Sequence, residues 1–213
     1  MLTSLQVAVG GYLVGLVIGI LGASAKLYGG PVLRDLATVY TTLIRAVPEL
    51  VLIVLLFYAG TDAVNQLLRL FDAGPVDING MVAGIVVIGI VQGGYTTEVL
   101  RGAILAVPRG HFDAARAYGF TGRQTMRRIT LPAMLPHALP GLANLWLIAT
   151  KDTALLAVVG FTELTLATRQ AAGVTKEYFL FFSAAGLLYL AVTLVSTYGI
   201  HLVERRARRG LVR

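Results

Sequence analysis

Three long stretches of this sequence contain no Asp, Glu, Lys or Arg, and they limit what the chain can fold into. They run from Met1 to Ala25, from Ile78 to Thr97 and from Tyr178 to Val203, where His201 is the one titratable group outside the tyrosines. Each reaches the roughly 20 residues that an α-helix needs to cross a bilayer. A helix also satisfies its own backbone hydrogen bonds inside lipid. The sequence therefore predicts an all-α membrane protein.

Two further apolar segments are interrupted by charges. One covers about residues 38–60 and carries Arg45 and Glu49, and the other covers about 137–161 and carries Lys151 and Asp152. The composition agrees with a membrane protein, because 56% of the residues are hydrophobic, 14% are charged and the mean hydropathy is +0.76. We expect a single domain over residues 1–213, with five transmembrane helices at about 4–26, 38–60, 79–101, 137–161 and 179–203. The first span is too long, and lacks the basic start, for a cleaved signal peptide.

The arginines and lysines outside these spans predict the orientation. Thirteen of them fall on one side of the expected membrane and three, Arg69, Arg169 and Lys176, on the other. Because basic residues stay in the cytoplasm, the N-terminus is expected outside and the C-terminus inside. The formal net charge of +7 thus reports topology rather than nucleic-acid binding. The outer connections, at about 61–79 and 162–177, are expected to be short and to face either a soluble binding protein or only solvent.

A cytoplasmic loop at about 108–132 has the pattern of two short helices separated by a glycine. Pro108 suits a first helical turn, Gly119 suits a left-handed helix stop, and Thr121 suits a cap for the second helix. The second helix is expected to stop at Leu131-Pro132. A narrow apolar face with small residues is expected on the first helix, where another surface can approach closely, at Phe112, Ala115 and Gly119. The loop therefore predicts a docking element for a partner protein.

The same loop resembles the EAA motif of permeases of ATP-binding-cassette (ABC) importers. The matching positions are Asp113, which replaces the usual Glu, with Ala114, Ala115, Gly119, Ile129, Leu131 and Pro132. The resemblance extends over nearly the whole chain to permeases for histidine, lysine–arginine–ornithine, arginine and the opines. It includes residues 44–65, 92–119 and Lys151-Asp152-Thr153-Ala154-Leu155, although Ala46 stands where the family commonly has Gly.

The resemblance implies the type I ABC importer (MetI-like) permease fold and a place in the bacterial cytoplasmic membrane. It implies alternating access for polar, basic amino acids such as arginine, lysine, histidine, ornithine or opines. The implied partners are a second permease chain, identical or paralogous, two cytoplasmic ATPases and an extracytoplasmic substrate-binding protein. The implied ATPase-docking residues are Phe112, Asp113, Ala114, Ala115, Arg116 and Gly119.

The chain shows no catalytic motif of its own. It has no cysteine and no Gly-Lys pair, so it has no Cys-ligated zinc site and no phosphate-binding P-loop. We therefore expect no enzyme activity, metal or cofactor in this chain, and ATP with Mg²⁺ on the partner ATPase.

Charges inside the expected spans mark where a substrate pathway is to be sought. Glu49 directly follows Pro48, which can bend a helix, and either meets a cationic substrate or forms a standing pair with Arg45 one turn away. Lys151 and Asp152 are adjacent and point about 100° apart, so each needs a structural partner elsewhere or a place on the pathway. Two polar residues of the third span complete the substrate-pathway candidates, Gln92 and Tyr95. At the end of that span, Glu98 and Arg101 are expected to form a local pair.

Two other classes of function remain open from the residues. One is a self-contained secondary transporter or channel for small polar solutes, which five spans do not suit because inverted repeats need paired spans. The other is a membrane scaffold that binds the ATPase without transport. Polar residues inside three of the expected spans count against a scaffold.

Overall fold

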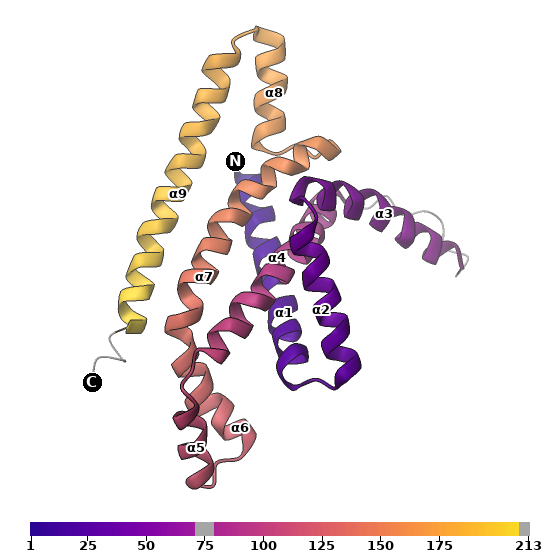
Figure 1. The fold of residues 1–213 in the computed structure, drawn as a ribbon. Helices are drawn as coiled ribbons and strands as arrows, with labels where there is room; N and C mark the ends of the chain where they lie inside the picture. The colour runs from indigo at the N-terminus through magenta and orange to yellow at the C-terminus, as the bar shows by residue number, and fades with distance from the viewer. Residues whose placement is uncertain (71–78, 209–213) are drawn as a thin grey trace.

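Every regular element of residues 1–70 and 79–208, the part of the chain described by the computed structural model, is a helix (Figure 1). The α-helices are α1 (Leu2–Tyr28), α2 (Pro31–Ala46), α3 (Glu49–Leu70), α4 (Gly80–Leu105), α5 (Arg109–Ala117), α6 (Gly122–Thr125), α7 (Leu131–Asp152), α8 (Leu164–Thr175) and α9 (Tyr178–Arg208). A π-helix, η1 (Met126–Thr130), joins α6 to α7, and a 3₁₀ helix, η2 (Thr153–Val159), follows α7. The all-α prediction is confirmed.

Five helical segments within these residues are long and apolar enough to cross a membrane. They are Leu2–Tyr28, Glu49–Leu70, Gly80–Leu105, Gly122–Val159 and Tyr178–Arg206. Figure 1 places the short helices α5 and α6 and the C-terminal end of α9 at one end of the bundle, and α8 at the other.

The second apolar segment differs from the single helix expected at about 38–60. Its helix α2 ends at Ala46, Val47 is extended with φ −97° and ψ 137°, and α3 begins at Glu49. Pro48 has no N–H to donate, and its ring would clash with the carbonyl of Ile44 four residues earlier, so the helical ladder breaks there. The outer connection expected from residue 61 is also helical as far as Leu70. The remaining connection, residues 71–78, lies outside the described residues.

Glycines allow α1 and α4 to pack closely. Gly11, Gly15 and Gly19 recur every four residues on α1 and meet α4, and a Cβ added at Gly19 would lie 2.3 Å from Cγ2 of Thr96. From the other side, a Cβ on Gly93 would lie 2.6 Å from Cγ2 of Ile18. Small residues at such spacing let helix backbones approach and gain van der Waals contact within lipid. Gly93 thus lets α4 approach α1 closely.

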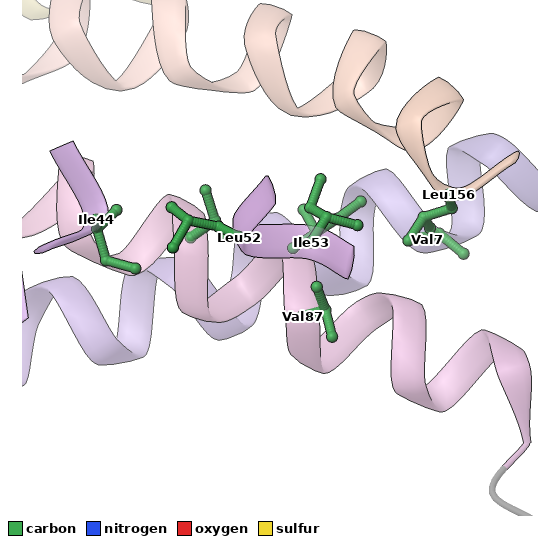
Figure 2. Close-up of a cluster of buried hydrophobic side chains, with 8 residues drawn as sticks. Val7, Ile44, Leu52, Ile53, Val87 and Leu156 are labelled. Atoms are coloured by element: carbon green, nitrogen blue, oxygen red, sulfur yellow. The ribbon is translucent and has the colours of Figure 1, made fainter. Parts of the chain in front are cut away.

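A buried apolar cluster joins the first four helices to η2. Figure 2 shows its side chains in a row, with Val7 and Leu156 at one end and Ile44 of α2 at the other. Ile53, from the first turns of α3, is 1% exposed within it. The cluster therefore fixes the start of α3 against α4 although the rest of α3 extends away from the bundle.

The loop at about residues 108–132 does not finish as expected. Thr121 does cap α6, accepting a hydrogen bond from Gln124 N at 3.3 Å in a capping box. The helix then does not stop at Leu131-Pro132, but passes through η1 into α7. The wider π turn lets Leu131 N donate to Met126 O, and Pro132 is the second residue of α7, in the first turn where its missing N–H is tolerated. The second half of the loop, α6 with η1, and α7 thus form one continuous helical path.

The connection at residues 162–177 is also more ordered than expected, because it folds as α8. Glu163 is 2% exposed and caps α8 by accepting from Leu166 N at 2.8 Å. Its other carboxylate oxygen lies 3.3 Å from the hydroxyl of Tyr189 on α9 and 3.5 Å from that of Ser4 on α1. This hydrogen-bonded group holds the N-terminal ends of α1 and α8 to α9.

Candidate functional site

A buried hydrogen bond between α4 and α7 forms the centre of the candidate site. Gln92 is fully buried, and its Nε2 donates to Oδ2 of Asp152 at 2.9 Å. Asp152 is the last residue of α7, where the α-helix gives way to the 3₁₀ turns of η2, and is 8% exposed. Among the described residues, Oε1 of Gln92 has no hydrogen-bond partner. A buried amide oxygen without a partner is uncommon in folded proteins and marks a place where a further hydrogen-bond donor would be stabilising.

Two further residues come close to this pair. Glu49, in the first turn of α3, interacts electrostatically with both Asp152 and Tyr95, and Tyr95 lies on α4 one turn after Gln92. The break at Pro48 makes Glu49 the start of a helix, where the helix dipole favours a carboxylate. Four of the six residues predicted for the substrate pathway therefore converge from three helices.

Arg45 and Lys151 take no part in an ion pair here. Both side chains are exposed, and the ion pairs found within residues 1–70 and 79–208 include neither Arg45–Glu49 nor Lys151–Asp152. The helix break separates Arg45 from Glu49, so the expected standing pair on one helical turn does not form. Two carboxylates thus lie close together without a paired cation in the described chain. Such a site attracts a cation because bringing one in relieves repulsion between like charges.

A second polar cluster sits toward the other end of α4 and is charge-balanced. Nζ of Lys26 lies 2.6 Å from both Glu98 Oε1 and the Thr41 hydroxyl, and Arg101 holds Oε2 of Glu98 at 2.9 Å. The local pair of Glu98 with Arg101 is confirmed. Lys26 is one of the thirteen basic residues that the sequence places on the expected cytoplasmic side, yet its side chain is only 10% exposed. The one sign in the sequence that Lys26 forms an ion pair is its position directly after a long charge-free run.

The first helix of the docking loop, α5, ends as the sequence indicates. Gly119 has φ +71°, its N–H donates to Arg116 O, and the next N–H, of Phe120, donates to Ala115 O, both at 2.9 Å. These two bonds make a Schellman motif, which satisfies the last carbonyls of the helix. The left-handed stop predicted at Gly119 is confirmed.

Two of the three residues expected on the apolar face of this helix, Phe112 and Ala115, pack inward, whereas Gly119 stays exposed. Ala115 is 3% exposed, and Phe112 packs on a core cluster that includes Val107 and Met134. Apolar residues at this spacing cover the nearest apolar surface, which here belongs to the same chain. The exposed residues of α5 are Arg109, Gly110, His111, Asp113, Ala114, Arg116 and Ala117, and Tyr118 at its C-terminal cap is exposed as well. Of the six residues predicted to dock the ATPase, Asp113, Ala114, Arg116 and Gly119 are thus exposed.

Comparison with known proteins places the chain among transport proteins. Residues 15–209 match the family described as binding-protein-dependent transport system inner membrane component. The chain is 43% identical to the histidine/lysine/arginine/ornithine transport system permease protein HisQ of Salmonella typhimurium, over all of this chain and 93% of that protein. It is 39% identical to the octopine transport system permease protein OccQ of Rhizobium radiobacter, over 99% of this chain and 89% of that protein.

Solved structures give the same result. A crystal structure of an amino acid ABC transporter with histidines superposes with a TM-score of 0.81 at 29% identity, covering 97% of this chain and 91% of that chain. The inward-facing MetNI methionine ABC transporter shares the fold with a TM-score of 0.73 at 18% identity, covering 96% of this chain and 91% of that chain. The predicted MetI-like fold is confirmed. The chain therefore belongs to the binding-protein-dependent transport system inner membrane components, as a membrane-spanning permease of an amino-acid ABC importer.

Proposed function

We propose that this permease carries basic amino acids and that Glu49 and Asp152 receive their cationic group. The observation that carries the proposal is the pair of neighbouring carboxylates without an ion-pair partner in residues 1–70 and 79–208. Relatives named for histidine, lysine, arginine, ornithine and octopine transport support the same substrate class.

Each residue of the cluster has a distinct role in the proposal. Gln92 fixes one oxygen of Asp152 and offers its own free Oε1 to an ammonium or guanidinium N–H. Tyr95 orients Glu49, to which it is electrostatically linked. Arg45 and Lys151, both exposed, are available to a substrate carboxylate. Two or three charge-assisted hydrogen bonds would then distinguish a basic amino acid from a neutral one.

The orientation follows from the arrangement of the ends. The α5–α6 loop and the arginine-rich end of α9 lie at the same end of the bundle (Figure 1), which the distribution of basic residues assigns to the cytoplasm. The N-terminus and α8 then face outside, where a substrate-binding protein delivers its cargo.

Transport in this proposal uses alternating access driven by partner subunits. Two cytoplasmic ATPases hold ATP and Mg²⁺ and contact the exposed side of α5, and a second permease chain completes the pathway. Movement of α5, which contacts η1, reaches Asp152 because α6, η1 and α7 follow one another without a break from Gly122 to Asp152. This path explains how hydrolysis on another subunit changes the site.

The substrate assignment is tested by Glu49→Gln, which keeps the shape of the side chain and removes its charge. Arginine uptake per assembled complex should fall roughly 10- to 150-fold relative to a neutral amino acid delivered by the same binding protein, which is what losing a charge-assisted bond of about 1.5–3 kcal/mol predicts. Asp62→Asn, an exposed acid on the same helix, is the control and should change neither rate. An equal loss for both substrates, or one explained by less complex, would reject the binding role. ATP-independent uptake would instead favour a secondary transporter.

The coupling assignment is tested by Gly119→Val. A valine at φ +71° is strained by about 1–2 kcal/mol, so the Schellman stop shifts and α5 loses its fixed orientation. ATP hydrolysis should then respond little to the loaded binding protein, although the complex assembles. Gly110→Val is the matched control, because neither glycine has an atom within 4 Å of an added Cβ and only Gly119 has a positive φ. Normal stimulation in Gly119→Val would contradict coupling through this loop.

A further inference from the structure

An apolar groove opens between α1, α7 and α9, away from the candidate substrate site. Its volume is about 440 Å³, and its lining includes Leu139 and Trp146 of α7 with Gly199 and Ile200 of α9. Tyr12 of α1 also lines it, but its hydroxyl donates to Leu142 O at 3.0 Å and its ring packs edge-on against Trp146. The tyrosine therefore presents its ring, with the polar end already satisfied.

The groove ends at a polar boundary near the C-terminal end of α9. Tyr12 and Trp146 belong to the middle of their helices, whereas the last lining residue, Glu204, is followed directly by Arg205 and Arg206. The 31 residues of α9 span about 46 Å, longer than a hydrocarbon core of about 30 Å, so its basic end reaches the headgroup region. An apolar channel that ends among cations has the shape and polarity of a bound phospholipid.

The charges at the mouth select the headgroup. Glu204 is partly covered, and its one ion-pair partner among the described residues is His201 at 3.8 Å. Arg205 and Arg206 are exposed and form no ion pair within the described part of the chain. Basic residues immediately beyond a transmembrane helix attract anionic lipids. Two free guanidiniums beside one acid leave a net positive mouth that suits a phosphate.

We propose that this groove binds an acyl chain of an anionic phospholipid, phosphatidylglycerol, whose phosphate meets Arg205 and Arg206. Glu204 then accepts a hydrogen bond from the glycerol hydroxyls of the headgroup rather than repelling it. The bound lipid fills the space between α9 and the α1–α7 pair. The lipid thereby supports α9, because the protein itself buries only 6% of the most apolar stretch of this helix.

The test uses the full chain in its assembled complex, stripped of lipid and titrated with phosphatidylglycerol or phosphatidylcholine of identical acyl chains. Native mass spectrometry should show one phosphatidylglycerol per copy of this chain, retained at least 10-fold more tightly than phosphatidylcholine. Gly199→Leu fills the groove and should lower that retention at least 10-fold. Gly186→Leu is the matched control, because it lies on the same helix outside the groove and its added Cβ also meets no atom within 4 Å. Arg205→Gln with Arg206→Gln should abolish the preference between the two lipids.

A photoreactive acyl chain on phosphatidylglycerol provides a second readout that needs no variant. Label should appear in residues 139–146 and 196–204. Equal retention of both lipids by the unaltered complex, equal effects of the two glycine variants, or label spread evenly over α3 and α9 would each overturn the proposal. Cross-linking of residue 196 to the second permease chain in place of lipid would overturn it as well.

Discussion

Two polar clusters on α4 differ in their charge balance. Glu98 has a lysine and an arginine within 3 Å, whereas Glu49 and Asp152, near Gln92, have no ion-pair partner in the part of the chain that the structure describes. A buried cluster whose charges are balanced within the protein holds helices together. In an unbalanced cluster the missing opposite charge can be supplied by a ligand, which gains binding free energy there. If Glu49 and Asp152 receive substrate as proposed, charge balance separates structural from transport residues better than burial does.

The largest effect on stability is expected for a substitution at Lys26. Lys26→Met leaves the half-buried Glu98 with Arg101 alone, which should lower stability by about 3 kcal/mol, the lower end for a broken buried pair. The thermal midpoint of the purified complex measures the change. Lys151→Met is the control, because that lysine is exposed and should leave the midpoint unaltered. A double variant that adds Glu98→Gln should recover part of the loss, and an unchanged midpoint in Lys26→Met would remove the distinction between the clusters.

A smaller effect on stability is expected at Gln92. Gln92→Met keeps the volume and removes the unsatisfied Oε1, which offsets part of the cost of leaving Asp152 Oδ2 without its donor, so stability should fall less than in Lys26→Met. The KM for arginine should increase about 2- to 12-fold, as the loss of a bond of about 0.5–1.5 kcal/mol predicts. Uptake assays and a thermal melt on the same preparation measure both quantities. A fall in stability with an unaltered KM would mean that this cluster is structural too.

The smallest effect is expected at Arg101, the more exposed cation of the balanced cluster. Its side chain is 36% exposed, so the pair with Glu98 is partly screened by solvent. Arg101→Gln should therefore cost less than about 1 kcal/mol and leave arginine uptake unchanged. If Arg101→Gln lowered the thermal midpoint as much as Lys26→Met does, then Lys26 would contribute no more than Arg101 to the stability of the cluster.

Much of the fold follows from local rules in the sequence. Charge-free runs of bilayer length give α1, α4 and α9, and the stop at Gly119 needs only the glycine that a left-handed position requires. Pro48 shows the limit, because a proline that can bend a helix can also end it. Whether it ends α2 depends on the packing of Ile44 and Ile53 on either side of the break.

The candidate site is only partly visible in the sequence. Glu49, Gln92, Tyr95 and Asp152 stand out because polar residues are rare within apolar segments. The contacts of Lys26 with Glu98, and of Ser4 with Glu163, join residues that are far apart along the chain, and no local pattern predicts them. The inward face of α5 was missed for a related reason, since periodicity identifies an apolar face but not the surface that covers it.

The glycine face of α1 is synthesised well before α4, the helix that covers it. Its partner α4 ends at Leu105, and at about 5–20 residues per second the ribosome needs roughly 4–15 s to get there from Tyr28. During that interval the small residues of α1 are not yet covered by α4, and Lys26 has not yet formed its ion pair with Glu98. Because Lys26 lies in the last turn of α1, its ammonium can reach the interfacial water while it waits. The same lysine can then be drawn into the bundle when α4 arrives, so its position lets the chain insert first and assemble later.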